Sequence, residues 1–584
     1  MKKKLITDFL YLNKTDDILK EYLELPVFDK KYNLKKNISY YKKWSDYKKK
    51  LSDNRKNLRL YDHFLNELII FLNNYHNTKY SKRYWSIILG QWLYKFISSM
   101  SFKWILINSL KKKNFIFLKK EIKLKDIIPL GIEDYEKIVG SNYWNHYGYT
   151  KIIEHSFSNK FIIKKTGKII KNHEKELIYQ KLKNKNTKGK ISLLIQKILN
   201  FLPQNKSTLI FSTYMSNFQE IKLNLLINKS LLYYKILRPY LLFEKKKLFE
   251  FNRKNFKKLK SSKTGLENFL STELLISLPS AYLENFRNIE NITNQIPFPK
   301  SPKKIFTTLG ISRSTLMDRY IARNVENGSS LILAQHGGAY FQHKLHFSSI
   351  HEVKISDKYL SWGNIRKKKI IPFGIIKNLN ITSKKSNKII LEVRKRSKYV
   401  GEIKLDSGFL ENKKYFDDLC TFFSLLKGKK ICENLLIKLH EKKSFWDEKK
   451  KFLSYNSGLK FLGEKKNMIK EMSSAKLIIH TFCGTGHLES LAVNKPTLIL
   501  FVHNFNLLND KTKNYFKKFI KLGIVHKTPE SLSKVLEYLD NNKKIENWWN
   551  SKKKQSLLRK YREDFGFFND EKINDLKKVI KSIK

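Results

Sequence analysis

The stretch Ser330–Gln335 reads SLILAQ and continues directly into the turn His336-Gly337-Gly338. A short, uninterrupted apolar run bounded by turn residues is typical of a β-strand. Upstream, Lys304–Thr308 has the character of another strand, and Ser314–Asn327 has the apolar spacing of a helix that stops at Gly328. Strand, helix and strand at this spacing predict a βαβ unit and therefore a parallel sheet.

A second α/β pattern begins after Pro372-Phe373-Gly374, which follows one more expected strand at Tyr359–Trp362. Beyond the break we expect strands at 388–393, 434–440, 476–481 and 496–501, a helix at 415–426, and another that runs through Leu491. The sequence therefore predicts an α/β fold with two Rossmann-like halves joined near residues 372–386. Two such halves face each other across a cleft, and ligands bind at the carboxyl ends of the strands that line it.

The N-terminal region has a different pattern. Residues from about 15 to 110 carry apolar side chains at helical spacing, as at Leu65, Leu68, Ile69 and Leu72. We expect a short strand at 4–10, a buried strand within 208–214 that ends in a polar loop, a helix at 223–237 stopped by Pro239, and helices from about Glu530 onward. The predicted units are residues 1–375, with helical additions at about 15–200, then 376–545, and a helical tail at 546–584 that packs back on the cleft.

The chain of 584 residues has a formal net charge of +65, from 117 Lys and Arg against 52 Asp and Glu. Such a charge is typical of nucleic-acid binding when the basic residues are clustered. Here Lys predominates, is spread along the whole chain, and accompanies abundant Ile, Asn, Phe and Tyr, the joint bias of an AT-rich genome. We therefore favour a solvated surface over a nucleic-acid interface, and retain attraction to anionic lipid as an open alternative.

Cysteine use indicates a reducing compartment, and the hydropathy of the chain favours neither a signal peptide nor a spanning helix. The three cysteines, Cys420, Cys432 and Cys483, have neither disulfide-like nor metal-like spacing. Asp8 and Lys14 interrupt any apolar core of a signal peptide. The most apolar stretch, Tyr84–Leu110, contains two lysines, which favours a buried or interfacial helix over a spanning one. We expect a cytoplasmic protein, either free or peripheral at the inner face of the cytoplasmic membrane.

The loop after the strand at 330–335 is the first candidate site. Gly337 and Gly338 allow a ligand to approach the main chain, and freed amides there can bind an anion. Gln335 and the two glycines are predicted binding residues, and His336 has the chemistry of a general base or a phosphate contact. A tight turn with an incidental histidine is the structural alternative. His343, His346 and His351 follow, but their spacing fits no standard metal site.

The second candidate site is the loop from His480 to Glu489, which joins a strand to a helix. A helix N-terminus offers unpaired amides and a favourable dipole for phosphate. Predicted binding residues here are Thr481, Gly484, Thr485, Gly486 and Glu489, and the Glu489 carboxylate is suited to ribose hydroxyls. The structural alternative is a helix with Thr485 as N-cap and Glu489 as dipole partner. The loop lacks the Gly-Lys-Ser/Thr ending of a Walker A motif.

A third candidate, Lys438 with His440, lies at the end of a strand in the second half. A cation and an imidazole there are positioned to face a diphosphate across the cleft, and a solvated strand end is the alternative.

Several of these stretches, taken in order, resemble a family of bacterial transferases encoded in O-antigen and surface-polysaccharide loci. The matching pieces are Arg83-Tyr84-Trp85 with Leu89-Gly90-Gln91-Trp92, Leu278-Pro279 with Tyr282–Phe286, Ala334–Tyr340, Glu352 through Ser356-Asp357 to Trp362-Gly363, Leu439-His440, and Thr485–Ala492. They span about residues 80 to 500, and their order makes them more specific together than any one alone.

The resemblance implies a GT-B-like glycosyltransferase: an acceptor-side unit at 1–375 and a donor-nucleotide unit at 376–545. It also implies that Thr485 and Gly486 hold donor phosphates and that Glu489 holds the ribose. No metal and no separate cofactor are expected, because the nucleotide sugar is itself a substrate. Two departures affect the donor: Lys438 stands where relatives tend to have Arg, and Phe341 replaces the usual Gly. Lysine cannot form a bidentate fork with phosphate.

The sequence thus predicts a glycosyltransferase that moves a sugar from a nucleotide-activated donor to a glycan or lipid-linked acceptor of the bacterial surface, O-antigen, lipopolysaccharide or capsule. A transferase that uses a CDP-linked polyol phosphate is the alternative within enzymes, since the same cleft suits it. A basic nucleic-acid-binding protein is the alternative of another class. Its features would be clustered Arg and aromatic side chains on one platform, whereas this chain has Gly loops after strands and dispersed Lys.

Overall fold

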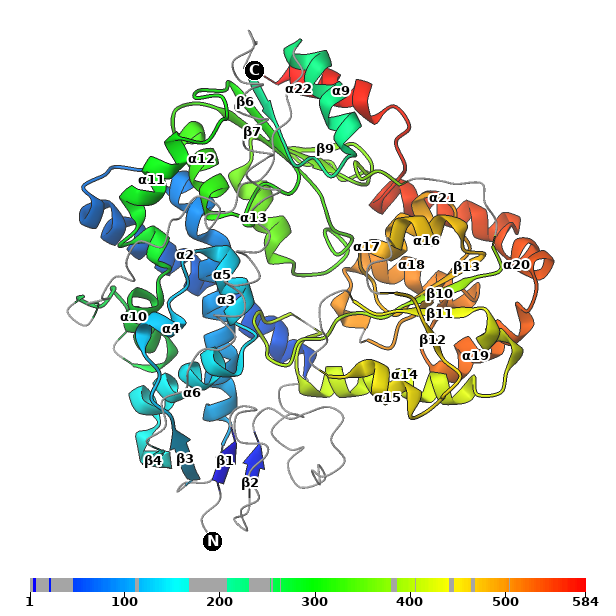
Figure 1. Ribbon diagram of the computed structural model, residues 1–584, viewed down its shortest axis with the longest axis horizontal. Helices are drawn as coiled ribbons and strands as arrows, with labels where there is room; N and C mark the ends of the chain where they lie inside the picture. The colour runs from blue at the N-terminus through cyan, green and yellow to red at the C-terminus, as the bar shows by residue number, and fades with distance from the viewer. Residues whose placement is uncertain are drawn as a thin grey trace.

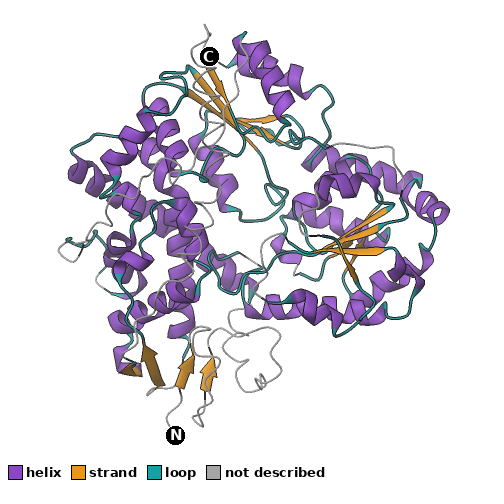
Figure 2. Cartoon of the chain, viewed as in Figure 1, coloured by secondary structure: helices purple, strands orange, loops and turns teal. Residues whose placement is uncertain are grey.

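The protein contains two large parallel sheets and a helical N-terminal region (Figures 1 and 2). The structure, a computed structural model, describes residues 4–6, 20–22, 46–110, 115–166, 207–229, 253, 256–262, 264–379, 386–404, 406–440, 446–463, 468–503 and 505–583.

The first large sheet has the strand order β5-β6-β7-β8-β9, with every neighbouring pair parallel. Its strands are β5 (Thr208–Ile210), β6 (Lys304–Thr307), β7 (Ser330–Ala334), β8 (Lys358–Ser361) and β9 (Ile370–Pro372). The helices that lie between these strands in the chain are α9 (Asn217–Asn228), α11 (Phe286–Asn294), α12 (Thr315–Glu326) and α13 (Phe347–Ile355). Helix α10 (Gly265–Ser277) also follows β5 but packs on α3 and α6 of the N-terminal region.

Burial on both faces explains the apolar run of β7. Leu331 and Leu333 belong to the large N-terminal core, which also contains Leu316 and Tyr320 of α12. Ile332 and Ala334 face the opposite core, which Leu576 of the C-terminal helix completes. Because successive side chains alternate between the two faces, a strand covered on both sides needs apolar residues at every position.

The second large sheet has the order β12-β11-β10-β13-β14-β15 and is likewise entirely parallel. Its strands are β10 (Ile389–Glu392), β11 (Leu435–Lys438), β12 (Lys460–Phe461), β13 (Leu477–His480), β14 (Thr497–Leu500) and β15 (Val525–His526). Its helices are α14 (Phe409–Leu425), α15 (Glu448–Leu453), α16 (Met468–Ser474), α17 (Thr485–Ala492), α18 (Asp510–Lys521) and α19 (Pro529–Tyr538). The prediction of two α/β halves with parallel sheets is confirmed.

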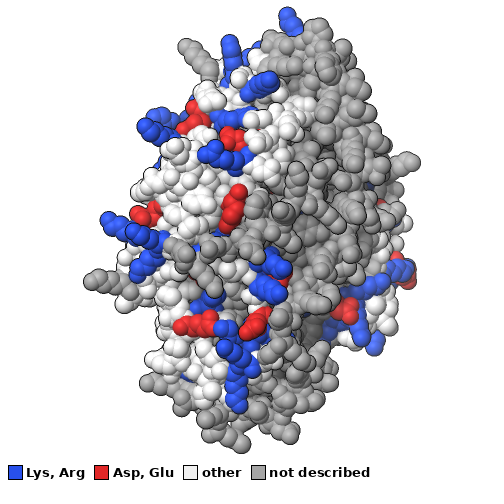
Figure 3. All heavy atoms as spheres, turned by 60° about the vertical axis from the view of Figure 1, so that its left-hand side comes forward, with Lys and Arg blue, Asp and Glu red and all other residues white. Residues whose placement is uncertain are grey.

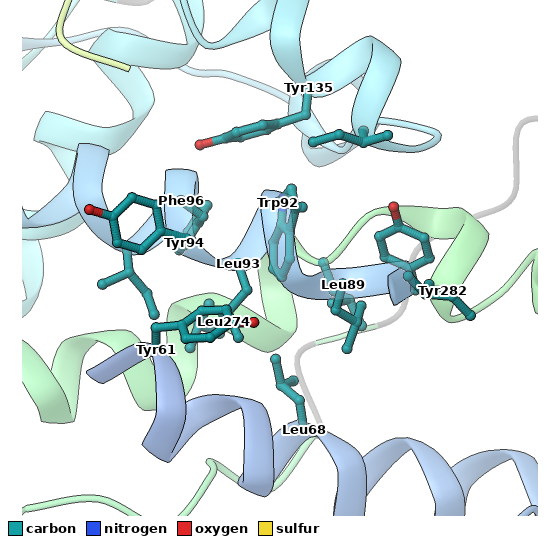
Figure 4. Close-up of a cluster of buried hydrophobic side chains, with 14 of the residues drawn as sticks. Tyr61, Leu68, Leu89, Trp92, Leu93, Tyr94, Phe96, Tyr135, Leu274 and Tyr282 are labelled. Carbon is teal, nitrogen blue, oxygen red and sulfur yellow. The ribbon is translucent and has the colours of Figure 1, made fainter. Parts of the chain in front are cut away.

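The N-terminal region is built on α2 (Tyr47–His76) and α3 (Lys82–Asn108), with α4 (Leu124–Ile127), α5 (Ile132–Ile138) and α6 (Asn142–Ser156) around them. A small sheet with the order β2-β1-β3-β4 adjoins them, formed by β1 (Lys4–Ile6), β2 (Lys20–Tyr22), β3 (Phe115–Lys119) and β4 (Phe161–Lys165). Figure 4 shows aromatic side chains of α2, α3 and α5 packed together in this core.

Helix α3 is buried on nearly all sides, as the sequence predicts. Its Lys103 is fully buried, donates to the Ser99 hydroxyl at 3.1 Å and lies 5.0 Å from the ring centroid of Trp144. An aromatic face and a hydroxyl thus compensate for the buried ammonium. None of the helices in the described residues is long and apolar enough to cross a membrane.

The C-terminal chain joins the two large sheets. After α20 (Asn542–Trp549), α21 (Lys552–Phe565) packs on α17, and α22 (Lys572–Ser582) packs beside α9 on the first sheet. Between them, the amide of Phe567 donates to the Trp362 carbonyl at 3.1 Å. A Cβ at Gly363 would lie 2.2 Å from the Asp564 carbonyl oxygen, so the close crossing requires glycine at this position.

A segment of the second unit also reaches into the N-terminal helices. Ile403 belongs to the N-terminal core, its amide donates to the Ser98 hydroxyl at 2.6 Å, and its carbonyl accepts from Asn54 at 2.9 Å. The Tyr399 hydroxyl donates to Asn142 at 2.8 Å. The helical region therefore helps to fix the position of the second sheet.

Two expected elements are corrected. The strand expected within 208–214 ends at Ile210, because Ser212 and Tyr214 have φ values of 49° and 69°, which an extended strand excludes. The expected helix at 223–237 is α9, which starts at Asn217 in a capping box on Ser216 and ends at the left-handed Lys229. Pro239 therefore does not end it, and residues 230–239 lie outside the described residues.

On the face shown in Figure 3, Lys and Arg side chains are scattered with Asp and Glu between them. This view agrees with the dispersed charge of the sequence.

Candidate active site

The loop after β7 is held in place by Gln335. Its side-chain Nε2 donates to the Gly337 carbonyl at 2.9 Å, and its side-chain oxygen accepts from the Trp362 backbone amide at 3.0 Å. Gln335 is fully buried. Gln335 therefore positions the loop, and its contact with a ligand stays a prediction.

His336 is linked to a buried network of phenols and a carboxyl. Its Nε2 lies 3.1 Å and its Nδ1 3.5 Å from the Tyr340 hydroxyl, which donates to Glu352 at 2.7 Å. The Tyr359 hydroxyl donates to the other Glu352 oxygen at 3.1 Å. The Tyr340 hydroxyl thus connects the imidazole to Glu352, whose second oxygen lies 3.8 Å from His336 Nδ1.

Burial sets the protonation of this network. Burial, followed by the nearby Arg313, lowers the pKa of His336 to about 4, so the imidazole is neutral at pH 7. Burial also raises the pKa of Glu352 to about 8, although the two phenols oppose this shift. A neutral imidazole and a carboxyl that holds a proton near pH 7 are therefore joined through one hydroxyl.

The second loop is tightly packed at both of its glycines. A Cβ at Gly484 would lie 2.1 Å from the Phe482 ring, and a Cβ at Gly486 would lie 2.4 Å from a Glu392 carboxylate oxygen. The N-cap of α17 is Gly484, and no side chain caps the helix. The alternative in which Thr485 caps α17 is therefore wrong, since Thr485 is the first helical residue and its hydroxyl points elsewhere.

That hydroxyl meets the loop of the first sheet. The Gly338 amide donates to Thr485 Oγ1 at 3.2 Å. A Cβ at Gly338 would lie 2.0 Å from the Gly484 carbonyl oxygen, so only glycine fits between the two loops. Nearby, the Gln342 carboxamide oxygen accepts from Tyr561 of α21 at 2.6 Å. The two predicted sites, 147 residues apart, thus form one interface between the sheets.

Glu489 follows Thr485 on α17 and forms an ion pair. Its carboxylate is 2.5 Å from the Lys377 ammonium, and both side chains are largely buried. Lys377 belongs to the connection between the sheets, and its ammonium lies 5.0 Å from the ring centroid of Tyr214. The predicted ribose contact therefore has a protein cation beside it in this structure.

Three polar side chains at the carboxyl ends of β10 and β13 support the loop. The Thr481 hydroxyl donates to the Glu392 carbonyl at 2.9 Å and lies 2.6 Å from the Tyr415 hydroxyl, fully buried. His480 Nδ1 lies 2.7 Å from the Glu392 carboxylate, and its Nε2 lies 3.0 Å from the Ser490 hydroxyl. Thr481 is thus placed to position the loop, and its predicted contact with a ligand stays untested.

Lys438 and His440 follow β11, the neighbour of β10. Lys438 pairs with Glu392 in the sheet register, is largely buried, and donates to the Gly463 carbonyl at 3.4 Å. Lys438 therefore lies beside Glu392, whose carboxylate contacts the Gly486 loop. His440, two residues beyond Lys438, is exposed to solvent.

Arg394, Arg396 and Asp406 form a charged cluster after β10 that the sequence reasoning missed. Both guanidinium groups pair with the Asp406 carboxylate. Although burial opposes it, these two cations hold the pKa of Asp406 well below its usual range. The Arg394 guanidinium also lies 5.6 Å from the ring centroid of Phe482. A cavity of about 370 Å³ adjoins the cluster, with Lys95 of α3 on its other side.

No group of three or more His, Cys, Asp and Glu in the described part of the chain has an arrangement that suits a metal ion.

A family model covers almost the whole chain. It matches residues 8–580 and is described as LIC12162 family transferase. The chain belongs to this transferase family. The family resemblance predicted from the ordered motifs is confirmed, and the surface-polysaccharide context is not part of that match. Among curated proteins, no sequence matches this transferase significantly.

Solved structures resemble the transferase only distantly. UDP-GlcNAc 2-epimerase from Neisseria meningitidis, bound to UDP-GlcNAc, has 12% identity and a TM-score of 0.30 over 51% of this chain and 81% of its own. MurG from Acinetobacter baumannii has 12% identity and a TM-score of 0.32 over 64% and 99%. The wall teichoic acid polymerase TagF, soaked with CDPG, has 11% identity and a TM-score of 0.28 over 48% and 71%. Values this low carry no conclusion about activity.

Proposed function

We propose that the protein transfers a sugar from a nucleotide-activated donor to a glycan or lipid-linked acceptor of the bacterial surface. Membership in a transferase family limits the reaction to group transfer. The observation that carries the proposal is the contact between Gly338 and Thr485, since it unites the loops at the carboxyl ends of two parallel sheets. Ligands of open α/β sheets bind at such strand ends.

The donor side of the proposed site is the second sheet. The N-terminus of α17, at Thr485 and Gly486, is proposed to bind a donor phosphate, because the first amides of a helix lack intrahelical partners and the helix dipole favours an anion there. Lys438 at the end of β11 supplies positive charge at the same edge. Glu489 is proposed to accept from the ribose hydroxyls, with Lys377 holding its carboxylate in place.

The acceptor side is the loop of the first sheet. In the proposed reaction an acceptor hydroxyl attacks the anomeric carbon of the donor, and the nucleotide leaves with its phosphate. His336 is proposed to accept the hydroxyl proton, because its imidazole is neutral at pH 7. The Tyr340 hydroxyl, which also donates to Glu352, holds the imidazole in place. The charge that develops on the leaving phosphate is stabilised by α17 and Lys438.

The proposed units are those expected from the sequence: an acceptor unit at 1–375, a donor unit at 376–545, and the tail at 546–584. The proposed location is the cytoplasmic face of the inner membrane, where nucleotide sugars and lipid-linked acceptors meet.

Donor turnover tests the proposal. The purified protein is incubated separately with UDP-, GDP-, CMP- and dTDP-sugars and with a CDP-linked polyol, and the released nucleotide is measured with and without membrane lipid extract. We expect release from one nucleotide sugar that increases with extract and is lost in His336→Ala. Release only from the CDP-linked polyol would replace the proposal with polyol-phosphate transfer, and release from none would reject it.

A further inference from the structure

Helix α9 exposes an apolar stripe that the proposed site does not use. Phe218 is 75% exposed and Leu225 is 46% exposed, although both are large apolar side chains. They are seven residues apart, so they lie on one face of the helix, with the partly exposed Ile221 between them. Other exposed apolar residues in the described part of the chain, such as Ile70 and Tyr75 on α2, do not share a helix face in this way.

The exposed charges of α9 and its C-cap are basic. Lys222 and Lys229 are exposed on α9, whereas its carboxylate, Glu220, is buried and accepts from Thr213. Helix α22 packs beside α9 and adds the exposed Lys578 and Lys581 (Figure 1). Asp575 lies 3.7 Å from Lys578 and offsets part of this charge.

The structure assigns this surface, here called the α9 patch (Phe218, Ile221, Leu225, Lys222 and Lys229), to docking on a bilayer with anionic headgroups. Exposed apolar side chains enter the boundary between headgroups and acyl chains, and surrounding lysines are attracted to anionic lipid. Phe218, the most exposed of the large apolar residues described, is suited to that insertion. The lysines of the patch pair with lipid phosphates, whereas an apolar protein partner would offer them no opposite charge. A bilayer is therefore the favoured occupant of the patch.

The patch lies close to the proposed site. The loop before α9 contains Tyr214, whose ring lies 5.0 Å from the Lys377 ammonium, and Lys377 pairs with Glu489. Phe218 is only four residues beyond Tyr214. A bilayer under α9 therefore lies on the side of Tyr214, Lys377 and Glu489, from which we propose that a lipid-linked acceptor approaches the site. This part of the inference rests on the proposed function.

Vesicle co-sedimentation of the full chain tests the assignment. Phosphatidylcholine vesicles with and without phosphatidylglycerol are compared for the wild type, the double variant Phe218→Ser/Leu225→Ser, and a matched control, Ile70→Ser/Tyr538→Ser, which removes two equally exposed apolar residues elsewhere. We expect binding only with phosphatidylglycerol, a loss of about tenfold or more in the α9 variant, and wild-type binding by the control. Lys222→Glu/Lys229→Glu should weaken binding most at low salt.

Equal binding by the α9 variant and the wild type would overturn the assignment, because the high net charge alone would then explain adsorption. Absence of vesicle binding would also overturn it, as would concentration-dependent self-association of the wild type that the α9 variant abolishes. Nucleotide binding is measured on the same variants. Vesicle binding through α9 without any nucleotide binding would leave the patch standing and reject the proposed transfer reaction.

Discussion

The Gly338 amide donates to the Thr485 hydroxyl across the interface between the two large sheets, and no side chain fits at Gly338. Each residue lies in a loop that follows a strand of a different sheet. The contact therefore fixes how far the His336 loop lies from the N-terminus of α17, and both the stability of the interface and the geometry of the proposed site depend on it.

Gly338→Ala should separate the two loops. Its Cβ would lie 2.0 Å from the Gly484 carbonyl oxygen, and backbone atoms must move to relieve such overlap. We expect a loss of about 1–3 kcal/mol in the free energy of unfolding, together with a large loss of transfer activity. Gly401→Ala is the control, since its nearest neighbours lie at 3.4 Å. Equal effects of the two substitutions in thermal unfolding would argue against the interface.

Phe341 occupies a left-handed backbone conformation, with φ of 58°, at the position where relatives are expected to have glycine. Glycine adopts this conformation without strain, whereas other residues pay about 1–2 kcal/mol. We therefore expect Phe341→Gly to be more stable than Phe341→Ala by about 1 kcal/mol, the reverse of the usual order. Denaturant unfolding of the two variants measures the difference, and Phe341→Ala as the more stable variant would refute the argument.

Glu489 and Lys377 should prove energetically coupled. Removing one partner leaves the other charge buried and unpaired, so Glu489→Gln and Lys377→Gln should each destabilise the protein. The two losses in the free energy of unfolding should add up to more than the loss in the double variant, which removes both charges. This loss follows from either role of Glu489. Only nucleotide affinity separates them: a ribose contact predicts weaker nucleotide binding by Glu489→Gln, and a purely structural pair predicts unchanged affinity in the folded variant.

Buried histidines should make the protein sensitive to acid. Burial lowers the pKa of His343 to about 4 and that of His351 and His487 to about 3. Because unfolded histidine titrates near 6.5, each contributes stability above that pH, and this stability is lost as the pH falls toward 3–4. The melting temperature should therefore decrease from pH 7 to pH 5.

His351 offers the cleanest test of that effect. Neither of its ring nitrogens has a hydrogen-bond partner among the described residues, and its ring stacks on Phe347 at 5.4 Å. His351→Leu should reduce the decrease in melting temperature between pH 7 and pH 5. The same substitution at the partly exposed His63 should leave the decrease unchanged. An identical pH response of wild type and His351→Leu would exclude His351 as a cause.

The fold was largely predictable from the sequence because both large sheets are buried on two faces. Strands such as 330–334 and 477–480 then appear as continuous apolar runs followed by glycine loops. Helix α13 was missed, since His351 and Glu352 interrupt its apolar face although both are buried. The link between His336 and Glu352 was missed for the same reason: a buried carboxyl stabilised by two phenols leaves no spacing signal in the chain.

The arginine cluster was equally hidden. Arg394 and Arg396 are two of many basic residues, and only the fold brings Asp406 between them. By contrast, the loops at 336–338 and 484–486 were identifiable, because glycines after buried strands are rare outside turns and close contacts. Their meeting at Gly338 and Thr485 required the structure.

The central claim is that the loops at 336–338 and 484–489 form one nucleotide-binding cleft. Thermal unfolding of the purified protein with UDP, GDP, CDP, CMP and dTDP tests it most directly. We expect a saturable increase in melting temperature with at least one nucleotide, and a smaller increase in Glu489→Gln. No increase with any of the five nucleotides would contradict it.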